Sequence, residues 1–340
     1  GLLAGGNREV VAPAPASRDK LERFHQAQYL DVLQKASDGV FDEAFIYLGL
    51  GTPDTPAFAR MFDYAALAAG ATLLGAELIL SDRARVAFNP SGGYHHARPA
   101  QASGFCYIND VALACLELAD AGKRVAYLDI DAHHGDGVQE AFYKRRDVLT
   151  ISLHESGKTL YPGTGFENEI GQGKGKGYSV NLPLPVGTYD QAYLRTFEQV
   201  VMPLLDAYGP DVLVVELGMD GLAGDPLAHL NLTNNVYADI LGRLLEHDVP
   251  VLASGGGGYH LENTARGWAL CWTVLSGAEL EDSMSWGMGG VMLESTDWVG
   301  GLRDRVLLSH GGQHQAVDEA LAAVVRKVRK LVFPIHGLVP

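Results

Sequence analysis

Carboxylates and imidazoles alternate in one short segment of the sequence, DIDAHHGDG at 129–137. If the segment is extended, Asp129, Asp131 and His133 point to the same side, because successive side chains of a strand alternate between its faces. Asp131 and His133, together with the distant Asp220, could supply three protein ligands to a divalent metal and leave positions open for water and substrate, as a catalytic zinc site requires. Two oxygen ligands and one nitrogen also suit Fe(II).

Two adjacent histidines, His95 and His96, follow a pair of glycines in the segment SGGYHH. Hydrolysis of an amide needs one proton transfer from the attacking water and another to the leaving amine, and two histidines beside a metal could perform both. Each imidazole needs an orienting partner, for which Asp129 and Asp136 are the available carboxylates. A single histidine would more often be structural, but an adjacent pair facing a predicted metal site favours acid–base catalysis.

Tyr259 follows four consecutive glycines, and its hydroxyl could donate a hydrogen bond to a developing oxyanion. The alternative is a tyrosine that packs against the next helix. The glycines lack the spacing of a dinucleotide-binding fingerprint, and GQGKGKG at 171–177 lacks the Walker A spacing, so we interpret the latter as a loop.

These polar segments follow short apolar runs rich in β-branched residues, which alternate with helical stretches. This alternation is typical of a parallel sheet covered by helices on both faces. We predict strands at 84–88, 125–130, 148–153, 211–217 and 249–253, and helices at 57–80, 109–121, 137–145, 190–207, 234–247, 263–275 and 314–331. Ligands of open α/β sheets lie beyond the carboxyl ends of the strands, so the polar loops should converge on one site.

The composition sets the broad class. A chain of 340 residues with 47% hydrophobic residues can bury one large core, so we expect a single domain over 1–340, with 1–17 as an extended lead. The 26 basic residues against 41 acidic ones give a charge of −15, which argues against nucleic-acid binding and favours cationic ligands, although an acidic surface that aids solubility is the more ordinary explanation than a steering field.

Three widely separated cysteines, Cys106, Cys115 and Cys271, predict neither a disulfide framework nor a thiolate metal site. This fits a reducing, cytoplasmic location. We identify no apolar run of about 20 residues and no signal-peptide pattern, so we expect a soluble protein without a membrane partner. A homo-oligomer is compatible with the sequence.

Taken in order, the motifs resemble those of the histone deacetylases, in particular the class I type and its bacterial relatives, which have the arginase/deacetylase fold. The matching motifs are GGYHHA (92–97), GFCYIND (104–110), YLDIDAHHGDG (127–137), SLH (152–154), YPGTG (161–165), LGMDGLAGDPL (217–227) and GGGGYHLENTARGW (255–268). The resemblance implies a central, mostly parallel sheet flanked by helices. It also implies a zinc-dependent deacetylase that hydrolyses the amide of Nε-acyl-lysine, with acetyl as the expected acyl group, in proteins or peptides.

Carried over position by position, the resemblance implies the following roles. Zinc would be held by Asp131, His133 and Asp220; the general acid–base pair would be His95 and His96, oriented by Asp129 and Asp136; and the carbonyl would be polarised by Tyr259. Structural potassium would be bound near the zinc through Asp129, Asp131, His133, Ser152 and Leu153, with a second, weaker site at Phe142, Arg145, Val148 and Tyr178.

For the substrate, the resemblance implies a narrow tunnel walled by Phe105 and Tyr161, with Gly104 as its floor, Leu227 on its rim and Asp54 holding the substrate backbone. A flat-sided apolar slot suits the methylene stem of lysine and excludes a charged, unacylated head. Either aromatic residue taken singly could instead be an ordinary core residue.

The sequence departs from the family's pattern in places. Only a short lead precedes the stretch that matches the family from about residue 20, where a strand and helix are usual. Tyr94 and Tyr161 replace less polar residues, so the acyl preference could differ. Leu227 stands where polyamine-selective members have an acidic residue, which favours lysine in a peptide.

Three alternatives remain open at this point. The first is an acetylpolyamine or other small-amide deacylase of the same fold, and the second is a non-catalytic module that binds acyl-lysine. The third is an arginase-like ureohydrolase, which would need a two-metal site with more carboxylates and histidines at the strand ends.

Overall fold

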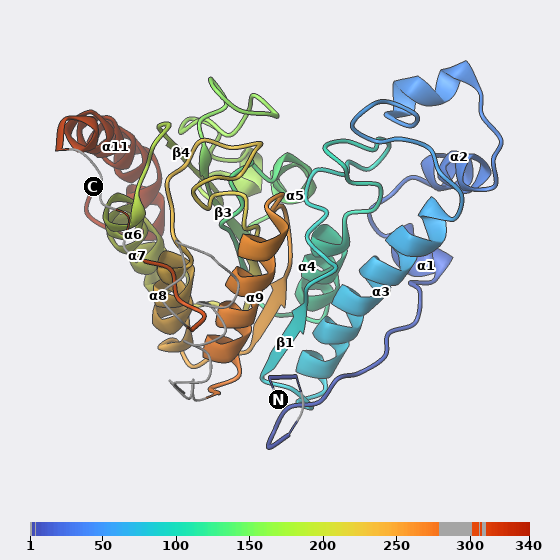
Figure 1. The fold of residues 1–340 in the computed structure, drawn as a ribbon, viewed down its shortest axis with the longest axis horizontal. Helices are drawn as coiled ribbons and strands as arrows, with labels where there is room; N and C mark the ends of the chain where they lie inside the picture. Colours follow the sequence, from blue (N-terminus) through green and yellow to red (C-terminus); the bar gives the residue numbers. More distant parts are fainter. Residues whose placement is uncertain (1, 4, 279–300, 306, 308–310) are drawn as a thin grey trace, which may run out of the picture.

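A six-stranded parallel sheet forms the centre of the protein (Figure 1). The computed structural model describes residues 2–3, 5–278, 301–305, 307 and 311–340. The strands are β1 (Val86–Asn89), β2 (Val125–Asp129), β3 (Val148–Glu155), β4 (Ser179–Leu184), β5 (Val212–Glu216) and β6 (Val251–Ser254). Their order across the sheet is β1-β6-β5-β2-β3-β4, and every neighbouring pair is parallel.

Helices cover both faces of this sheet. On one face lie α3 (Met61–Leu80), α4 (Asp110–Asp120) and α5 (Asp136–Phe142), and on the other lie α6 (Asp190–Thr196), α7 (Met202–Tyr208), α8 (Asn234–Leu245), α9 (Leu261–Leu275) and α11 (Gly311–Val332). Short helices α1 (Arg18–Leu21), α2 (Ala27–Ser37) and η1 (Glu43–Leu48) pack beyond α3, while η2 (Gly173–Gly175) and η4 (Phe333–His336) lie in the second half of the chain.

The residues of β2 show why two apolar layers form. Val125 and Tyr127 pack with α3 and α4, whereas Ala126 and Leu128 pack with the helices of the opposite face. All five residues of this strand are buried, as expected for a parallel strand covered on both sides. The predicted fold class, a parallel sheet with helices on both faces, is therefore confirmed.

Most predicted elements are present, with three differences. The five predicted strands exist, but β4 at the edge was missed, and it contains Asn181 and Pro183, residues that are rare in strand interiors. The predicted helix at 190–207 is interrupted by one π-helical segment, η3 (Phe197–Val201), between α6 and α7. The helices before residue 50 were not predicted.

One expectation about apolar segments was wrong. Helix α3 is long and apolar enough to cross a membrane by length and hydropathy alone. However, 56% of its most apolar 18-residue stretch is buried within the protein. Its buried side packs against α4, β1 and β6. Residues before α1 also lie against it, since the amide of Ala16 donates to the carbonyl of Ala66 at 2.8 Å. We interpret α3 as a core helix.

Candidate active site

The polar residues singled out in the sequence gather at the carboxyl edge of the sheet. Asp129 ends β2 and is paired in register with Glu216, which ends β5. His95 follows β1, and Tyr259 follows β6. Their convergence follows from the parallel arrangement, because all strands end at the same edge.

The loop after β1 is held in place by the carboxylate of Asp110 at the start of α4. This carboxylate accepts hydrogen bonds from the amides of Gly93, at 3.1 Å, and Tyr94, at 2.8 Å. Gly93 has a φ of +98°, and a Cβ there would lie 2.5 Å from the carbonyl oxygen of Gly255. Glycine is therefore needed for this loop to approach the loop that carries Tyr259.

Asp131, His133 and Asp220 form a compact, buried group, as the sequence predicted. One ligand atom from each lies within 4.8 Å of the others. His133 Nδ1 is 3.1 Å from Asp131 Oδ1 and 2.8 Å from Asp220 Oδ2. Cβ atoms at Gly218 and Gly257 would lie 1.9 Å from Asp131 Oδ2 and 2.1 Å from Asp220 Oδ2, so only glycine leaves room for the two carboxylates.

The charges of this group fit a cation. Burial raises the pKa of Asp220 to about 7, and the neighbouring Asp131 adds to the effect. Burial lowers the pKa of His133, but the two carboxylates outweigh it and raise the value to about 10. Two buried carboxylates thus hold a proton on the imidazole, and a divalent cation could replace that proton. The donor set and the space fit a three-ligand metal site.

The two adjacent histidines lie side by side, with different partners. The Nε2 atoms of His95 and His96 are 3.0 Å apart. His95 Nδ1 is 2.9 Å from Asp129 Oδ2 and 3.0 Å from Glu216 Oε1, whereas His96 Nδ1 is 2.8 Å from Asp136 Oδ1. The predicted pairing of each histidine with its aspartate is therefore present, with Glu216 as an additional partner of His95.

The unequal partners separate the pKa values of the pair. Burial lowers the pKa of His95, but Glu216 and Asp129 outweigh it, so its pKa lies well above the usual value. Burial lowers the pKa of His96 to about 4, and the neighbouring His95 lowers it further against the opposing effect of Asp136. The two histidines therefore differ in proton affinity, and His95 holds a proton more strongly than His96.

Tyr259 borders a cavity of about 300 Å³ that reaches the proposed metal site. The cavity is lined by residues of four loops, among them His95, His96, Asp131, His133, Phe105 and Tyr259. The backbone amide of Tyr259 donates to Asp225 Oδ2 at 2.8 Å, which fixes the residue at the end of the glycine run. Burial raises the pKa of the Tyr259 phenol well above its usual value, and the nearby Asp131 and Asp220 raise it further, so the hydroxyl remains a donor.

The residues expected to surround a slot for a long side chain lie close to His96 and Tyr259. A Cβ at Gly104 would lie 2.4 Å from the His96 ring and 2.9 Å from the Tyr161 ring, so this glycine lets the backbone approach both. The Tyr161 ring meets the His96 ring edge-on, with centroids 5.0 Å apart, and Phe105 similarly meets Tyr259 at 5.8 Å. Phe105 is 46% exposed and Tyr161 41%, so neither is a core residue, but only Phe105 lines the cavity, and the slot between the two rings stays a prediction.

The two remaining substrate residues lie at the surface. Leu227 is 40% exposed, and its amide donates at 2.9 Å to Asp225, the same carboxylate that accepts from Tyr259. Asp54 is exposed in a segment that is tied to the slot through Tyr107, whose hydroxyl donates to the carbonyl of Pro56 at 2.6 Å. Both positions agree with a rim, and their contacts with substrate remain a prediction.

The residues linked with the first potassium site lie directly beside the metal-binding segment. Asp129 and Ser152 are paired in register across β2 and β3. Ser152 Oγ is 2.8 Å from His154 Nδ1, and the carbonyl of Leu153 accepts from the Tyr193 hydroxyl at 3.4 Å. Asp131 and His133 follow on the same segment. The set is brought together, and potassium binding stays a prediction.

The residues linked with the second potassium site lie around the start of β3. The amide of Arg145 donates to the carbonyl of Phe142 at 2.9 Å, and that of Thr150 to the carbonyl of Tyr178 at 2.9 Å. Val148 begins the strand between them. Both carbonyls already accept hydrogen bonds, that of Tyr178 also from the Thr150 hydroxyl at 3.4 Å, and cation binding here stays a prediction.

Four residues around the site were not predicted from the sequence. Tyr127 and Glu216 lie next to Asp129, Arg98 pairs with Asp136 at 2.6 Å, and Asp225 holds the Tyr259 loop. Glu216 gave one available signal, since it is a charged residue that ends an otherwise apolar strand, VLVVE. The other three depend on contacts between distant segments.

Comparisons with known proteins agree with this geometry. A profile of the histone deacetylase domain matches residues 3–275. Histone deacetylase 8 of Xenopus tropicalis is 43% identical over 269 residues, which are 78% of this chain and 72% of that protein. Histone deacetylase B of Dictyostelium discoideum is 40% identical over 274 residues, 79% of this chain and 64% of its own.

Solved structures give the same result. The crystal structure of an HDAC homologue from Aquifex aeolicus superposes with a TM-score of 0.84 at 34% identity, covering 94% of this chain and 88% of that one. A structure of an HDAC homologue complexed with SAHA matches equally well. This chain is similar to these proteins over most of its length. It combines a sheet of this topology with a buried Asp–His–Asp group and paired histidines. The chain belongs to the histone deacetylase family, whose members are deacetylating amidohydrolases.

Proposed function

We propose that this protein is a zinc-dependent deacetylase that hydrolyses the amide of Nε-acyl-lysine in proteins or peptides, with acetyl as its main acyl group. The observation that carries the proposal is the convergence of a buried Asp–His–Asp group, two histidines of unequal proton affinity and Tyr259 around one cavity. Membership of the deacetylase family supports the reaction class.

A divalent metal bound by Asp131, His133 and Asp220 would act as a Lewis acid on the amide carbonyl and on the attacking water. The protein's own residues supply the remaining steps. His96 has the lower pKa of the pair and would take a proton from water and later return it to the nitrogen of the departing lysine. His95, whose Nε2 lies 3.0 Å from that of His96, has the higher pKa, and a proton held on it would favour the negative charge that develops on the carbonyl oxygen.

The slot supports lysine as the amine. A lysine stem is a chain of four methylene groups, which fits between two exposed aromatic rings better than a compact or branched group does. Leu227, which we assign to the rim, is apolar and partly exposed. A polyamine substrate carries further positive charges along its chain and would meet no carboxylate from this residue. These features favour acyl-lysine over acetylpolyamines.

A substrate panel tests the proposal. Peptides carrying acetyl-lysine and longer acyl-lysines, with acetylspermidine as a competing candidate, are incubated with the protein before and after chelation and after addition of Zn(II) or Fe(II). We expect the acetyl-lysine peptide to be hydrolysed fastest, activity to vanish on chelation, and Zn(II) to restore it. Faster turnover of acetylspermidine, or activity that survives chelation, would contradict the proposed substrate or the metal dependence respectively.

A further inference from the structure

Arg98 follows the paired histidines by two residues and reaches back to the carboxylate that lies beside one of them. Its Nη2 atom donates to Asp136 Oδ2 at 2.6 Å. The other oxygen of this carboxylate, Oδ1, lies 2.8 Å from His96 Nδ1. Asp136 thus stands between the histidine and the guanidinium, with one oxygen directed at each.

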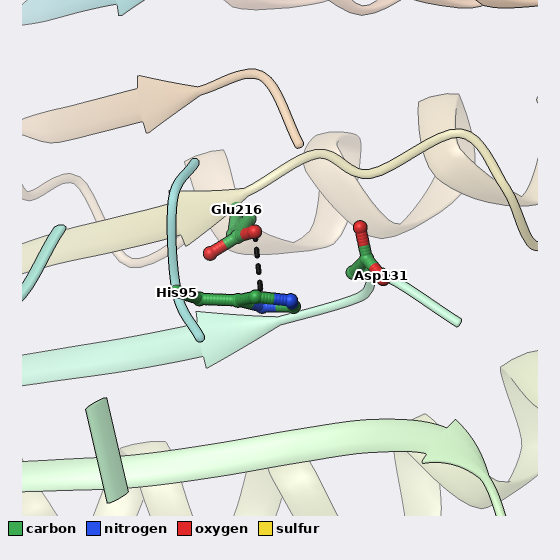
Figure 2. A group of neighbouring side chains, drawn as sticks. All are labelled: His95, Asp131 and Glu216. Atoms are coloured by element: carbon green, nitrogen blue, oxygen red, sulfur yellow. Dashed lines mark ion pairs between the residues drawn. The ribbon is translucent and has the colours of Figure 1, made fainter. Parts of the chain in front are cut away.

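The two histidines differ in how their carboxyl partners are anchored. Figure 2 shows the carboxyl group of Glu216, at the end of β5, beside the His95 ring, and Asp129 ends the neighbouring strand β2. Both groups therefore belong to paired strands. Asp136 instead begins α5 after a loop, and Gly135 before it provides no side-chain cap for the helix. The orientation of Asp136 therefore depends more on its side-chain contacts.

The backbone that carries Arg98 is held in place. Asn109 Nδ2 donates to the carbonyl of Ala97 at 2.9 Å, and the amide of Arg98 donates to the carbonyl of Gln101 at 2.9 Å. The first turn of α5 packs directly against this segment, since a Cβ at Gly137 would lie 2.4 Å from the Ala97 carbonyl oxygen. The guanidinium and the carboxylate on α5 therefore start from backbones that have little freedom to move apart.

A second arm of the guanidinium reaches Glu140, one turn farther along α5. Arg98 Nη1 donates to Glu140 Oε2 at 3.3 Å. Residues four apart lie on one face of a helix, where like charges repel, so a cation between the two carboxylates offsets that repulsion. The two arms differ in their surroundings, because the Asp136 side chain is 5% exposed and that of Glu140 46%. An exposed ion pair contributes little, whereas a buried carboxylate oxygen that loses its donor is costly.

We propose that Arg98 is a positioning residue of the acid–base pair, which holds the Asp136 carboxylate so that Oδ1 stays directed at His96. A planar carboxylate with both oxygens bonded cannot turn about its Cβ–Cγ bond. Among the described residues, no other group donates to Oδ2. Without Arg98 the carboxylate can turn towards water, and His96 then loses its orienting partner for part of the time. The inference rests on the proposed function, because it assigns Arg98 to the acid–base pair of that reaction.

Direct contact with substrate is the alternative role, because 39% of the Arg98 side chain is exposed. The two roles differ in their kinetic effect. Loss of a substrate contact raises KM, whereas misplacement of a catalytic group lowers kcat. The short bond from Nη2 to a buried carboxylate favours the positioning role.

Substitutions at the two ends of the guanidinium contacts separate these roles. Arg98→Met keeps an unbranched stem without either bond, and kcat on an acetyl-lysine peptide should fall about 10- to 100-fold, the range for lost partners of orienting groups, with KM changed less than about 2-fold. Arg98→Lys keeps one cation for Asp136 but no fork, so kcat should recover to within about 5-fold of the parent. Glu140→Gln is the matched control, which removes the exposed arm alone and should leave kcat within about 2-fold.

A second readout does not depend on turnover. The ring Nδ1–H of His96, observed by ¹H–¹⁵N NMR of the full chain and assigned by comparison with His96→Gln, should resonate at low field in the parent and in Glu140→Gln. In Arg98→Met it should shift upfield or exchange rapidly with water. If the parent hydrolyses no acyl-lysine substrate, the proposed function fails, whereas this resonance still decides whether Arg98 holds the contact between Asp136 and His96.

An Arg98→Met protein with the kcat and ring resonance of the parent would overturn the inference. So would one whose KM rises while kcat is unchanged, because Arg98 would then contact substrate. A Glu140→Gln variant as impaired as Arg98→Met would also refute the role, since a general effect of charge on α5 would explain both. If Arg98→Met does not fold, Arg98→Gln provides the test, because its amide ends well short of the Nη2 position. Parent-like kcat and resonance in Arg98→Gln would then exclude the positioning role.

Discussion

The sharpest prediction concerns the space around the proposed metal ligands. Gly257 lacks a Cβ, and adding one would crowd these ligands. Gly257 lies so close to the site that a Cβ there would be 2.1 Å from Asp220 Oδ2 and 2.9 Å from Asp131 Oδ2. The φ of Gly257 is not positive, so alanine can adopt the same backbone conformation. Gly257→Ala therefore tests the position of the ligands and little else.

The expected magnitude follows from the distances. Ordinary van der Waals contact begins at 3.4 Å, so the Asp220 carboxylate or the Gly257 backbone must move by at least 1.3 Å, the difference between 3.4 and 2.1 Å. Metal–ligand distances tolerate deviations of about 0.2 Å. Disturbing a group that supports a ligand typically weakens metal binding by about 10- to 100-fold, and we expect at least this loss, equivalent to about 1.4 to 2.8 kcal/mol.

The assay is competition between the protein and a chelator of known affinity for Zn(II), with thermal unfolding of the metal-free protein as the measure of folding. Gly242→Ala is the control, because a Cβ at this position in α8 meets open space. It should leave zinc affinity unchanged and stabilise the helix by up to about 1 kcal/mol. A Gly257→Ala protein that is folded and binds zinc within 2-fold of the parent would refute the ligand assignment of Asp220.

Three further predictions concern the catalytic groups. Tyr259→Phe should lower kcat on the order of 100-fold with little change in KM, measured by steady-state kinetics, and an unchanged kcat would remove the hydroxyl from the reaction. Because the pKa of His96 is about 4, His96 remains deprotonated well below pH 6.5. The pH profile of kcat in the parent should therefore show no inflection near pH 6.5 that arises from His96. An inflection near pH 6.5 that moves in Asp136→Asn would contradict this. Burial raises the pKa of Asp136, but His96 and Arg98 outweigh burial and lower the pKa to about 2. The ionised Asp136 therefore adds to the free energy of unfolding above about pH 3.8, and this stabilisation is lost as the pH falls towards 2. Urea unfolding between pH 2 and 5 should therefore depend less on pH in Asp136→Asn, and an unaltered slope would contradict this.

The sequence carried most of the information on the catalytic side chains. Asp129, Asp131 and His133 were expected on one side if the strand continued, but β2 ends at Asp129 and bends follow, so Asp131 and His133 meet Asp220 through the loop after the strand. The glycines were informative for a related reason. Glycine next to an acidic or imidazole group indicates a close approach of the backbone, and a Cβ at Gly218 would indeed lie 1.9 Å from Asp131.

What could not be predicted depends on contacts across the sheet. The strand β4 carries Asn181 and Pro183, which obscure its apolar pattern, and only its place at the edge makes them acceptable. Glu216 could be seen to end an apolar strand, but its partners could not be named. They follow from the pairing of β5 with β2, which places it beside Asp129.

Strand order also explains why the site lies where it does along the edge. From β2 the chain continues to β3 and β4 on one side, whereas β5, β6 and β1 occupy the other side. The connections that leave the ends of β2 and β5 therefore diverge to opposite parts of the sheet and open a crevice between them, which is the usual ligand position in open α/β sheets. Asp131 follows β2 and Asp220 follows β5, so the proposed ligands border this crevice. Tyr259 comes from the neighbouring β6, and the order β6-β5-β2 is what brings it to the same cavity as Asp131 and His133.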